Sequence, residues 1–247
     1  MPTTIKTEAW DGVSAPSLPA GWNAAADYVT ATAHYRSSPN ELLLSNSAGS
    51  GANYYATWGT ADGVSGQVQV SATVRFGAAA AGNQIGLTAR GTASTLDSSS
   101  TTQYVMWCKT LSSGGTKDQV TIARIASGSE TQLAANLMTG TNRFAAAGWY
   151  RLQLVCNGTS LQALVQRLSD GYWLQGNTWV STQAVAITAT DSALGTSGYA
   201  GLVMQTAGGT QDLSADDWLL EALDPTLWPY TRRMQPVPRP DNRAYLV

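Results

Sequence analysis

Apolar and polar residues alternate over long segments of this chain. Between residues 67 and 76, every even position is apolar and every odd position is polar. Shorter alternating segments place apolar side chains at Tyr104, Met106 and Cys108, and then at Tyr150, Leu152, Leu154 and Cys156. Because successive side chains of a strand point to opposite faces, this period of two predicts strands with one buried face and one wet face.

A turn signal separates two of these segments. Asn157-Gly158 follows Cys156, and the alternation resumes with Leu161, Ala163 and Val165. Asn-Gly between alternating strands predicts a tight type I′ hairpin with positive φ at both turn residues. Residues 157–159 also match a glycosylation sequon. We interpret them as the turn, because no secretory route is visible in the sequence.

Further strands are expected near residues 28–35, 41–46, 84–90, 118–126, 183–188, 199–205 and 216–223. Links rich in Ser, Gly and Thr join them, and no segment shows helical periodicity over as many as about 12 residues. No repeat of fixed period is evident, which argues against a propeller or a β-helix. The pattern therefore predicts an all-β sandwich or barrel.

The last part of the chain, residues 224–247, has a different composition. Five of the nine prolines lie there, and proline can neither extend a helix nor occupy a central strand. The segment also carries large apolar residues, which need a surface to cover them. We therefore expect a body over 1–223 and an extended docking arm over 224–247, with the contacts of the arm made by Leu227, Trp228, Tyr230, Arg232 and Arg233.

Charge changes this picture in two ways. Only 12% of the residues are charged, whereas the usual share is about 25%. A weakly charged composition of this kind is common in extracellular β-proteins and virion proteins. The arm has four arginines and two aspartates, 4 − 2 = +2, so the body carries −2 − 2 = −4. A basic arm on an acidic body suits docking onto a second copy of the chain. No basic patch interleaved with aromatics predicts nucleic-acid binding.

Targeting signals and cysteines add little. The first residues lack the apolar core of a signal peptide, and no run reaches the roughly 18 apolar residues of a membrane span. We expect that the protein is not secreted by means of a signal peptide. The alternative is that a signal peptide precedes this sequence. Cys108 and Cys156 lie at inward positions of strands, and we interpret them as buried free thiols, with a disulfide as the alternative.

Four short motifs occur in a characteristic order. Leu18-Pro19-Ala20-Gly21-Trp22 closes an N-terminal run that begins at Trp10, and the others are Gly148-Trp149-Tyr150-Arg151-Leu152, Ser197-Gly198-Tyr199-Ala200-Gly201-Leu202 and Asp216-Asp217-Trp218. Together they resemble the concanavalin A-like, laminin-G-like jelly-roll domains over roughly residues 8–223. The resemblance implies a two-sheet antiparallel sandwich whose last strand pairs with its first. It also implies core positions for Trp149 and Trp218.

Catalytic chemistry is not expected. Glycosidases of the laminarinase type in this class carry Glu-x-Asp-x-x-Glu, and the chain has no such motif. Asp216 and Asp217 are adjacent, so alternation sends them to opposite faces. His34 is the only histidine, without a nucleophile elbow, and we interpret it as an ordinary residue.

No P-loop or Cys/His zinc cluster is present, so we expect no catalytic site, no metal site and no cofactor. Calcium is the one ion that the resemblance leaves open, because it implies that Asp11, Asp212, Asp216 and Asp217 come together at the first and last strands. Turn and capping roles are the interpretation we favour for these carboxylates.

Aromatic residues are the remaining binding candidates. Tyr54, Tyr55 and Trp58 form one group, and Trp173 and Trp179 flank a polar loop. Exposed rings of this kind stack on sugars, whereas core or subunit-interface positions are the interpretation we favour for them.

The main functional hypothesis is a non-catalytic structural protein of a tailed-bacteriophage virion, either a capsid decoration or a tail or fibre component. It would assemble with other virion proteins, and with copies of itself, through the arm. The alternative is a lectin-like module that binds a host-surface glycan or polysaccharide. Neither hypothesis involves nucleic acid or a membrane.

Overall fold

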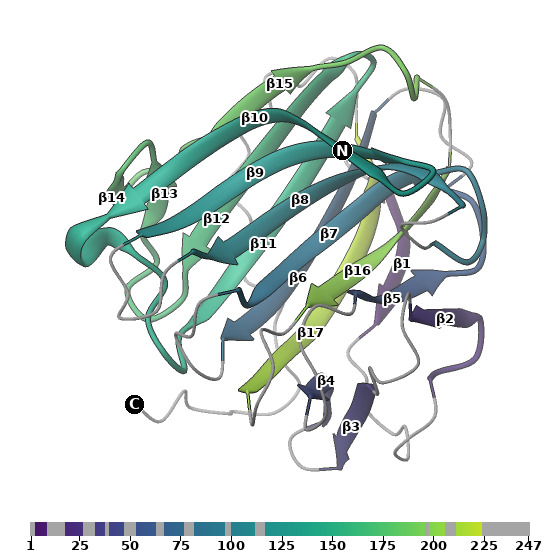
Figure 1. The fold of residues 1–247 in the computed structure, drawn as a ribbon, viewed down its shortest axis with the longest axis horizontal. Helices are drawn as coiled ribbons and strands as arrows, with labels where there is room; N and C mark the ends of the chain where they lie inside the picture. The colour runs from purple at the N-terminus through teal and green to yellow at the C-terminus, as the bar shows by residue number, and fades with distance from the viewer. Residues whose placement is uncertain are drawn as a thin grey trace.

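The computed structural model describes residues 3–8, 18–26, 33–37, 40–46, 53–62, 67–76, 82–96, 100–111, 117–195, 198–205 and 211–223. For residues 8, 24–26, 33–37, 40–46, 53–54 and 211–212 it describes the backbone alone. Two antiparallel sheets stack into a sandwich, with the seven-stranded sheet in front of the ten-stranded sheet in Figure 1. This is the all-β, two-sheet antiparallel jelly roll that the sequence predicts.

The ten-stranded sheet has the strand order β14-β13-β12-β11-β6-β17-β4-β3, with β1 added beside β17 and β15 beside β12. Its strands are β1 (Thr3–Glu8), β3 (Ala33–Ser37), β4 (Asn40–Asn46), β6 (Gln67–Phe76), β11 (Trp149–Asn157), β12 (Ser160–Arg167), β13 (Trp173–Gln175), β14 (Thr178–Val180), β15 (Ile187–Thr190) and β17 (Gln211–Ala222).

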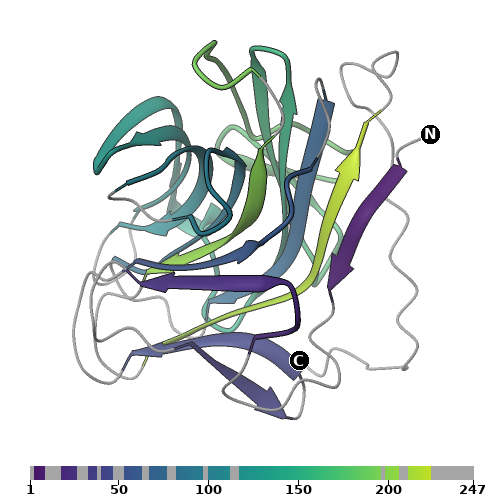
Figure 2. The same cartoon turned by 90° about the vertical axis from the view of Figure 1, so that its right-hand side faces the viewer.

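The seven-stranded sheet has the order β10-β9-β8-β7-β16-β5-β2. Its strands are β2 (Trp22–Ala26), β5 (Asn53–Trp58), β7 (Gln84–Gly91), β8 (Thr102–Thr110), β9 (Lys117–Ala126), β10 (Ser129–Thr139) and β16 (Tyr199–Gln205). Figure 2 shows that the teal strands at one edge of this sheet curl strongly. Among the described residues the only helix is a single 3₁₀ turn, Gly140–Asn142, so no described helix is long enough to cross a membrane.

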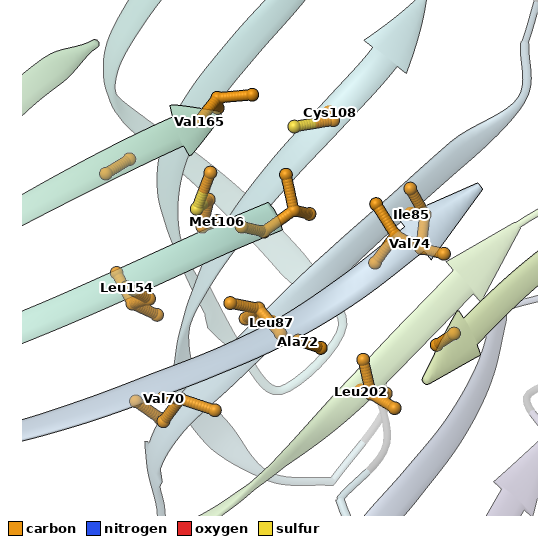
Figure 3. Close-up of a cluster of buried hydrophobic side chains, with 14 of the residues drawn as sticks. Val70, Ala72, Val74, Ile85, Leu87, Met106, Cys108, Leu154, Val165 and Leu202 are labelled. Carbon is orange, nitrogen blue, oxygen red and sulfur yellow. The ribbon is translucent and has the colours of Figure 1, made fainter. Parts of the chain in front are cut away.

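The core lies between the two sheets and follows the alternation in the sequence. Figure 3 shows side chains of the ten-stranded sheet, such as Val70 and Leu154, meeting side chains of the seven-stranded sheet, such as Met106 and Leu202. Cys108 and Cys156 also point into this layer as buried free thiols, which confirms that prediction.

The wet face expected for residues 67–76 is not found. Gln69, Ser71 and Thr73 point away from the core, but all three are buried. β6 is a central strand with β11 on one side and β17 on the other, so neighbouring side chains enclose these polar groups. The amide Nε2 of Gln69, for example, donates to Glu221 Oε2 over 3.1 Å.

The hairpin turn also differs from the expectation. Asn157 pairs with Ser160, so the two turn residues are Gly158 and Thr159. Of the two, Gly158 alone has positive φ, at 55°. Positive φ at the first turn residue defines type II′, so the prediction of type I′ was wrong. The glycine is needed, but one position earlier in the turn than expected.

Two motifs of the jelly-roll resemblance take the expected places. Trp22 N donates to Pro19 O over 3.2 Å and Gly21 has a φ of 87°, which makes 19–22 a type II turn. Glu8 pairs with Trp218, so the last strand does lie beside the first. Trp218 is buried, and its ring meets Trp22 edge-on at 4.8 Å between ring centroids.

Trp149 does not take the core position implied for it. Tyr150 is the residue of this strand that enters the core, and Trp149 is half-buried on the opposite side. The alternation had already placed Tyr150 on the inward face with Leu152 and Leu154, and adjacent side chains of a strand point to opposite faces, so only the position that the resemblance implied for Trp149 was wrong.

Several expectations fall outside the described residues. These are the whole arm, 224–247, together with Asp11 and the side chains of His34, Tyr54 and Asp212. The arm contacts expected for Leu227, Trp228, Tyr230, Arg232 and Arg233 therefore stay predictions, as does the division at residue 223.

Candidate functional site

The outer face of the seven-stranded sheet carries an unusual set of apolar side chains. Six of them point away from the core from strands of this sheet, and with Leu96, from the segment after β7, they form a second buried cluster, which we call the aromatic floor: Tyr55, Leu96, Val105, Trp107, Ala123, Ile125 and Val203. Outward-facing sheet positions in a soluble sandwich are normally polar. All seven side chains are at most 3% exposed, so the protein itself already covers this apolar layer.

Glycine shapes the centre of this floor. Gly86 of β7 pairs with Trp107 of β8. A Cβ atom at Gly86 would lie 3.1 Å from Cε3 of Trp107 and 2.2 Å from the carbonyl oxygen of Met106. The indole can therefore lie close to the β7 backbone because no side chain is present at position 86.

A band of polar side chains crosses the sheet next to the floor. Register pairing aligns Gln205 with Gln84, Gln84 with Lys109, and Lys109 with Gln119. We call these four residues the glutamine row. All four are half-buried, and the amide of Gln84 donates to Oε1 of Gln205. The row ends at Leu137 of β10, which is 43% exposed.

The β9–β10 hairpin folds over this face. Glu130 pairs with Ile125, and Ile125 pairs with Gln103 at the start of β8. The carboxylate of Glu130 nevertheless meets the ammonium of Lys109, near the end of β8, with 3.1 Å between Oε1 and Nζ. The strands at this edge of the sheet curl strongly (Figure 2). Lys109 Nζ also lies over the Trp107 ring, 5.5 Å from its centroid.

Polar atoms lie buried within the floor. Trp107 Nε1, Thr88 Oγ1 and Thr121 Oγ1 are enclosed, and none has a hydrogen-bond partner among the described residues. Thr121 pairs with Trp107, and Thr88 pairs with Val105, so the three groups lie on adjoining strands of one face. Buried polar groups in proteins are nearly always hydrogen-bonded. Other buried side chains of the chain, such as Thr73 and Ser214 on the other sheet, also have such atoms, but these three lie together on the face that carries the floor.

The aromatic residues named as possible glycan-binding candidates are not brought together, as the four with described side chains show. Tyr55 belongs to the aromatic floor, whereas Trp58 packs against the opposite, core side, with Lys6 Nζ 4.7 Å from its ring centroid. Trp173 is buried on the outer face of the ten-stranded sheet. Alternation within β5 sends Tyr55 and Trp58 to opposite faces, whereas their separation from Trp173 depends on which sheet each strand joins.

Trp179 is half-buried at the end of the sandwich. The Arg167 guanidinium lies 4.7 Å from its ring centroid, and the Tyr150 ring lies 6.0 Å away. Its Nε1 donates to the carbonyl of Asn142 over 3.0 Å. The ring is therefore engaged by its own protein, and the polar loop beside it anchors the β13–β14 hairpin through Asn177, whose Oδ1 accepts from Thr139 N.

The acidic residues near β17 do not follow simple alternation. The register against β6 shifts between Asp216 and Leu219, and Asp217 has a φ of 49°. This bulge invalidates the argument that two adjacent aspartates must face opposite ways. Within the described part of the chain, no group of three or more His, Cys, Asp or Glu side chains is arranged to hold a metal.

The sequence analysis missed the glutamine row. The signal was present, because Gln84, Gln119 and Gln205 each alternate with apolar core residues of their own strands. Only the strand order places the four residues side by side, since β16 is far from β7, β8 and β9 in sequence.

No protein-family model matches the chain, and no similar sequence was found among curated proteins. Solved structures do share the fold. A xylan β-1,4-xylosidase from Bacillus halodurans C-125 aligns with a TM-score of 0.58 and 14% identity over 87% of this chain, which spans only 39% of the xylosidase chain. The Ulex europaeus lectin UEA-II, complexed with galactose, aligns with a TM-score of 0.56 and 11% identity over 90% of this chain and 100% of the lectin.

A Bacillus subtilis protein of unknown function with a galectin-like fold aligns with a TM-score of 0.56 and 9% identity over 89% of this chain and 97% of its own. Identities this low establish the fold alone. The chain therefore has the jelly-roll fold of the concanavalin A-like class, as lectins and galectin-like proteins do.

Proposed function

We propose that the protein is a non-catalytic carbohydrate-binding module that holds a glycan on the outer face of its seven-stranded sheet. The observation that carries this proposal is the set of three glutamines in the glutamine row, Gln84, Gln119 and Gln205, beside the aromatic floor. Each glutamine amide both donates and accepts hydrogen bonds, as a sugar hydroxyl does. An aromatic ring is an apolar surface on which the carbon-bound face of a sugar can pack, and Trp107 lies next to these groups, buried beneath Lys109.

The fold supports this proposal without assigning it. The lectins and galectin-like proteins that share the architecture have the same two-layer sandwich, and one of them is described in complex with galactose. Fold alone does not fix function, so the argument rests on the side chains of this chain.

The absence of catalysis is part of the proposal. A glycosidase needs two carboxyl groups about 5–9.5 Å apart. Of the described strand residues on the outer face of the seven-stranded sheet, Glu130 alone carries a carboxyl group, and that group pairs with Lys109. Glu221 lies on the other sheet and accepts from Gln69.

A glycan panel containing galactosides and xylo-oligosaccharides tests the proposal. Binding should weaken roughly 2- to 10-fold in Gln84→Ala and in Gln205→Ala, the range expected for one lost hydrogen bond. Gln175→Ala is the matched control, because Gln175 is exposed and lies on β13, a strand of the other sheet. A panel with no ligand, or binding equal in all four proteins, would overturn the proposal.

Catalysis has its own measurement. Incubation with bacterial surface polysaccharides and xylan should release no reducing ends. Release that persists after purification and disappears in Glu130→Gln would show that the module is an enzyme.

A second hypothesis is a structural role in a virion, in which the protein would be located. Its support is the weakly charged composition and the Pro-rich arm of the sequence. The two roles are compatible, because a glycan-binding module carried on a particle would need both a sugar site and a docking segment.

A further inference from the structure

Trp107 is the ring best placed to receive a sugar on this face, but it is covered. It is only 2% exposed, and the ammonium of Lys109 lies over the ring at 5.5 Å from its centroid. Gly86 lies against the same indole. A sugar could reach the ring only if Lys109 moved away.

Glu130 holds Lys109 in this place. The ion pair, at 3.1 Å, joins the tip region of the β9–β10 hairpin to the end of β8. The side chain of Lys109 is 15% exposed and that of Glu130 is 36% exposed, so the contact lies at the surface. Ser129, Thr131 and Gln132, the neighbours of Glu130, are also exposed, so this end of β10 is held by few buried contacts. Segments of this kind open at low energetic cost.

Beneath the cover lie polar groups for which the described part of the chain supplies no hydrogen-bond partner. The buried Trp107 Nε1 is a donor, and the buried hydroxyls of Thr88 and Thr121 can donate and accept. A ligand with several hydroxyl groups would supply the missing partners. Ordered water would satisfy the same atoms, and the binding experiment below separates the two.

We propose that Trp107, Thr88 and Thr121 form a covered sugar subsite, and that the Lys109–Glu130 ion pair keeps the β9–β10 hairpin closed over it. This inference rests on the proposed function and adds to it the residues of the deepest contact and the element that controls access. The measured glycan affinity is then the affinity of the open form multiplied by the fraction of molecules in which the cover is open.

A closure predicts a change in glycan affinity of opposite direction to the change expected for an ordinary contact residue. If Lys109 and Glu130 touched the sugar, removing their charges would weaken binding. If instead the two residues hold the cover shut, removing their charges strengthens glycan binding. A surface ion pair corresponds to a roughly 1.5- to 5-fold change in an equilibrium, so Glu130→Gln and Lys109→Met should each bind up to about 5-fold more tightly.

Salt provides a second readout. Screening weakens an exposed ion pair, so the affinity of the wild-type protein should rise between low salt and 0.5 M salt. The affinity of Glu130→Gln should stay level. Asp170→Asn, which breaks the exposed Arg167–Asp170 pair next to the β13 strand, is the matched control and should behave as wild type.

Trp107 needs a conservative replacement because it is buried. Trp107→Phe keeps an aromatic ring and removes Nε1, and its thermal unfolding shows whether the fold persists.

Hydrogen exchange measured without any glycan follows the opening of the cover directly. Amides of residues 127–132 should exchange faster in Glu130→Gln than in wild type or Asp170→Asn.

The outcomes are distinct. Tighter glycan binding and faster exchange in Glu130→Gln, with weaker binding in folded Trp107→Phe, support the covered subsite. If glycans bind but Glu130→Gln binds equally or more weakly, or if exchange at 127–132 is unchanged, the covered subsite is overturned while the proposed function stands. If no variant binds any glycan of the panel, the proposed function fails and the subsite fails with it.

Discussion

The hydroxyl of Tyr104 donates to Oδ1 of Asp191 over 2.8 Å and so connects β8 to the loop that follows β15. The same carboxylate accepts from Arg124 Nη1 over 2.7 Å and from the amide of Ala193. Because Asp191 N also donates to the carbonyl of Thr159, the residue joins the two sheets at one end of the sandwich.

Asp191→Asn should destabilise the protein by about 1–3 kcal/mol at pH 7, since it removes charged hydrogen bonds. Burial alone would raise the pKa of Asp191, but the Ala193 amide, the Tyr104 hydroxyl and Arg124 together hold it below its usual value. A lowered pKa in the folded state gives stability that is present above about pH 4 and is lost as the pH falls through the folded value.

Denaturant unfolding at pH 7 and pH 3 checks this prediction. The difference between wild type and Asp191→Asn should shrink at the lower pH. Asp170→Asn, in an exposed pair, should lose no more than about 1 kcal/mol. A difference for Asp191→Asn that grows on acidification would contradict the assignment.

The type II′ turn predicts a strong effect at Gly158. Its φ of 55° lies in the left-handed region, which is disfavoured for branched side chains. Gly158→Val should therefore destabilise by about 1–2 kcal/mol, even though a Cβ at this position would meet no other atom within 4 Å. Gly195→Ala is the control, because Gly195 is equally uncrowded and its φ is not positive. Equal stability of the two variants in thermal unfolding would show that the turn is of another type.

The two thiols should be inert in the folded protein. Burial raises the pKa of Cys156 to about 12, and burial, with Asp118 nearby, raises the pKa of Cys108 well above its usual value. Since the thiolate is the reactive form, a thiol reagent at pH 8 should label neither residue until denaturant is added. Rapid labelling of one residue under native conditions would show that its strand opens locally.

The arm prediction concerns residues 224–247. Deleting them should leave the sandwich folded, because Leu223 is already buried and its amide donates to the carbonyl of Gln67. We expect the truncated protein to lose its assembly with other protein surfaces. Trp228→Ala should cause much of the same loss, since a few aromatic anchors carry most of the energy of an interface.

Circular dichroism and light scattering of the truncated and full-length proteins provide the measurement. Normal assembly without the arm would rule out its docking role. A truncated protein that fails to fold would show instead that the arm completes the sandwich.

The sequence alone predicted the strands whose two faces differ in polarity. β6, β8 and β11 appear as alternating segments because their inward residues, such as Val70 and Met106, must be apolar to fill one core. β10 was missed for the opposite reason, because the exposed residues at its start, Ser129 and Glu130, carry no such signal.

What the alternation determined is the side of the sheet on which each residue lies, since that depends only on its own strand. It placed Trp107 opposite Met106 and Cys108 without any knowledge of its neighbours. The tertiary structure decided which outward residues meet. Strand order set Gln205 beside Gln84, and the curl of β10 carried Glu130 to Lys109. These contacts join segments far apart in the chain, and their energies depend on packing that no local pattern encodes.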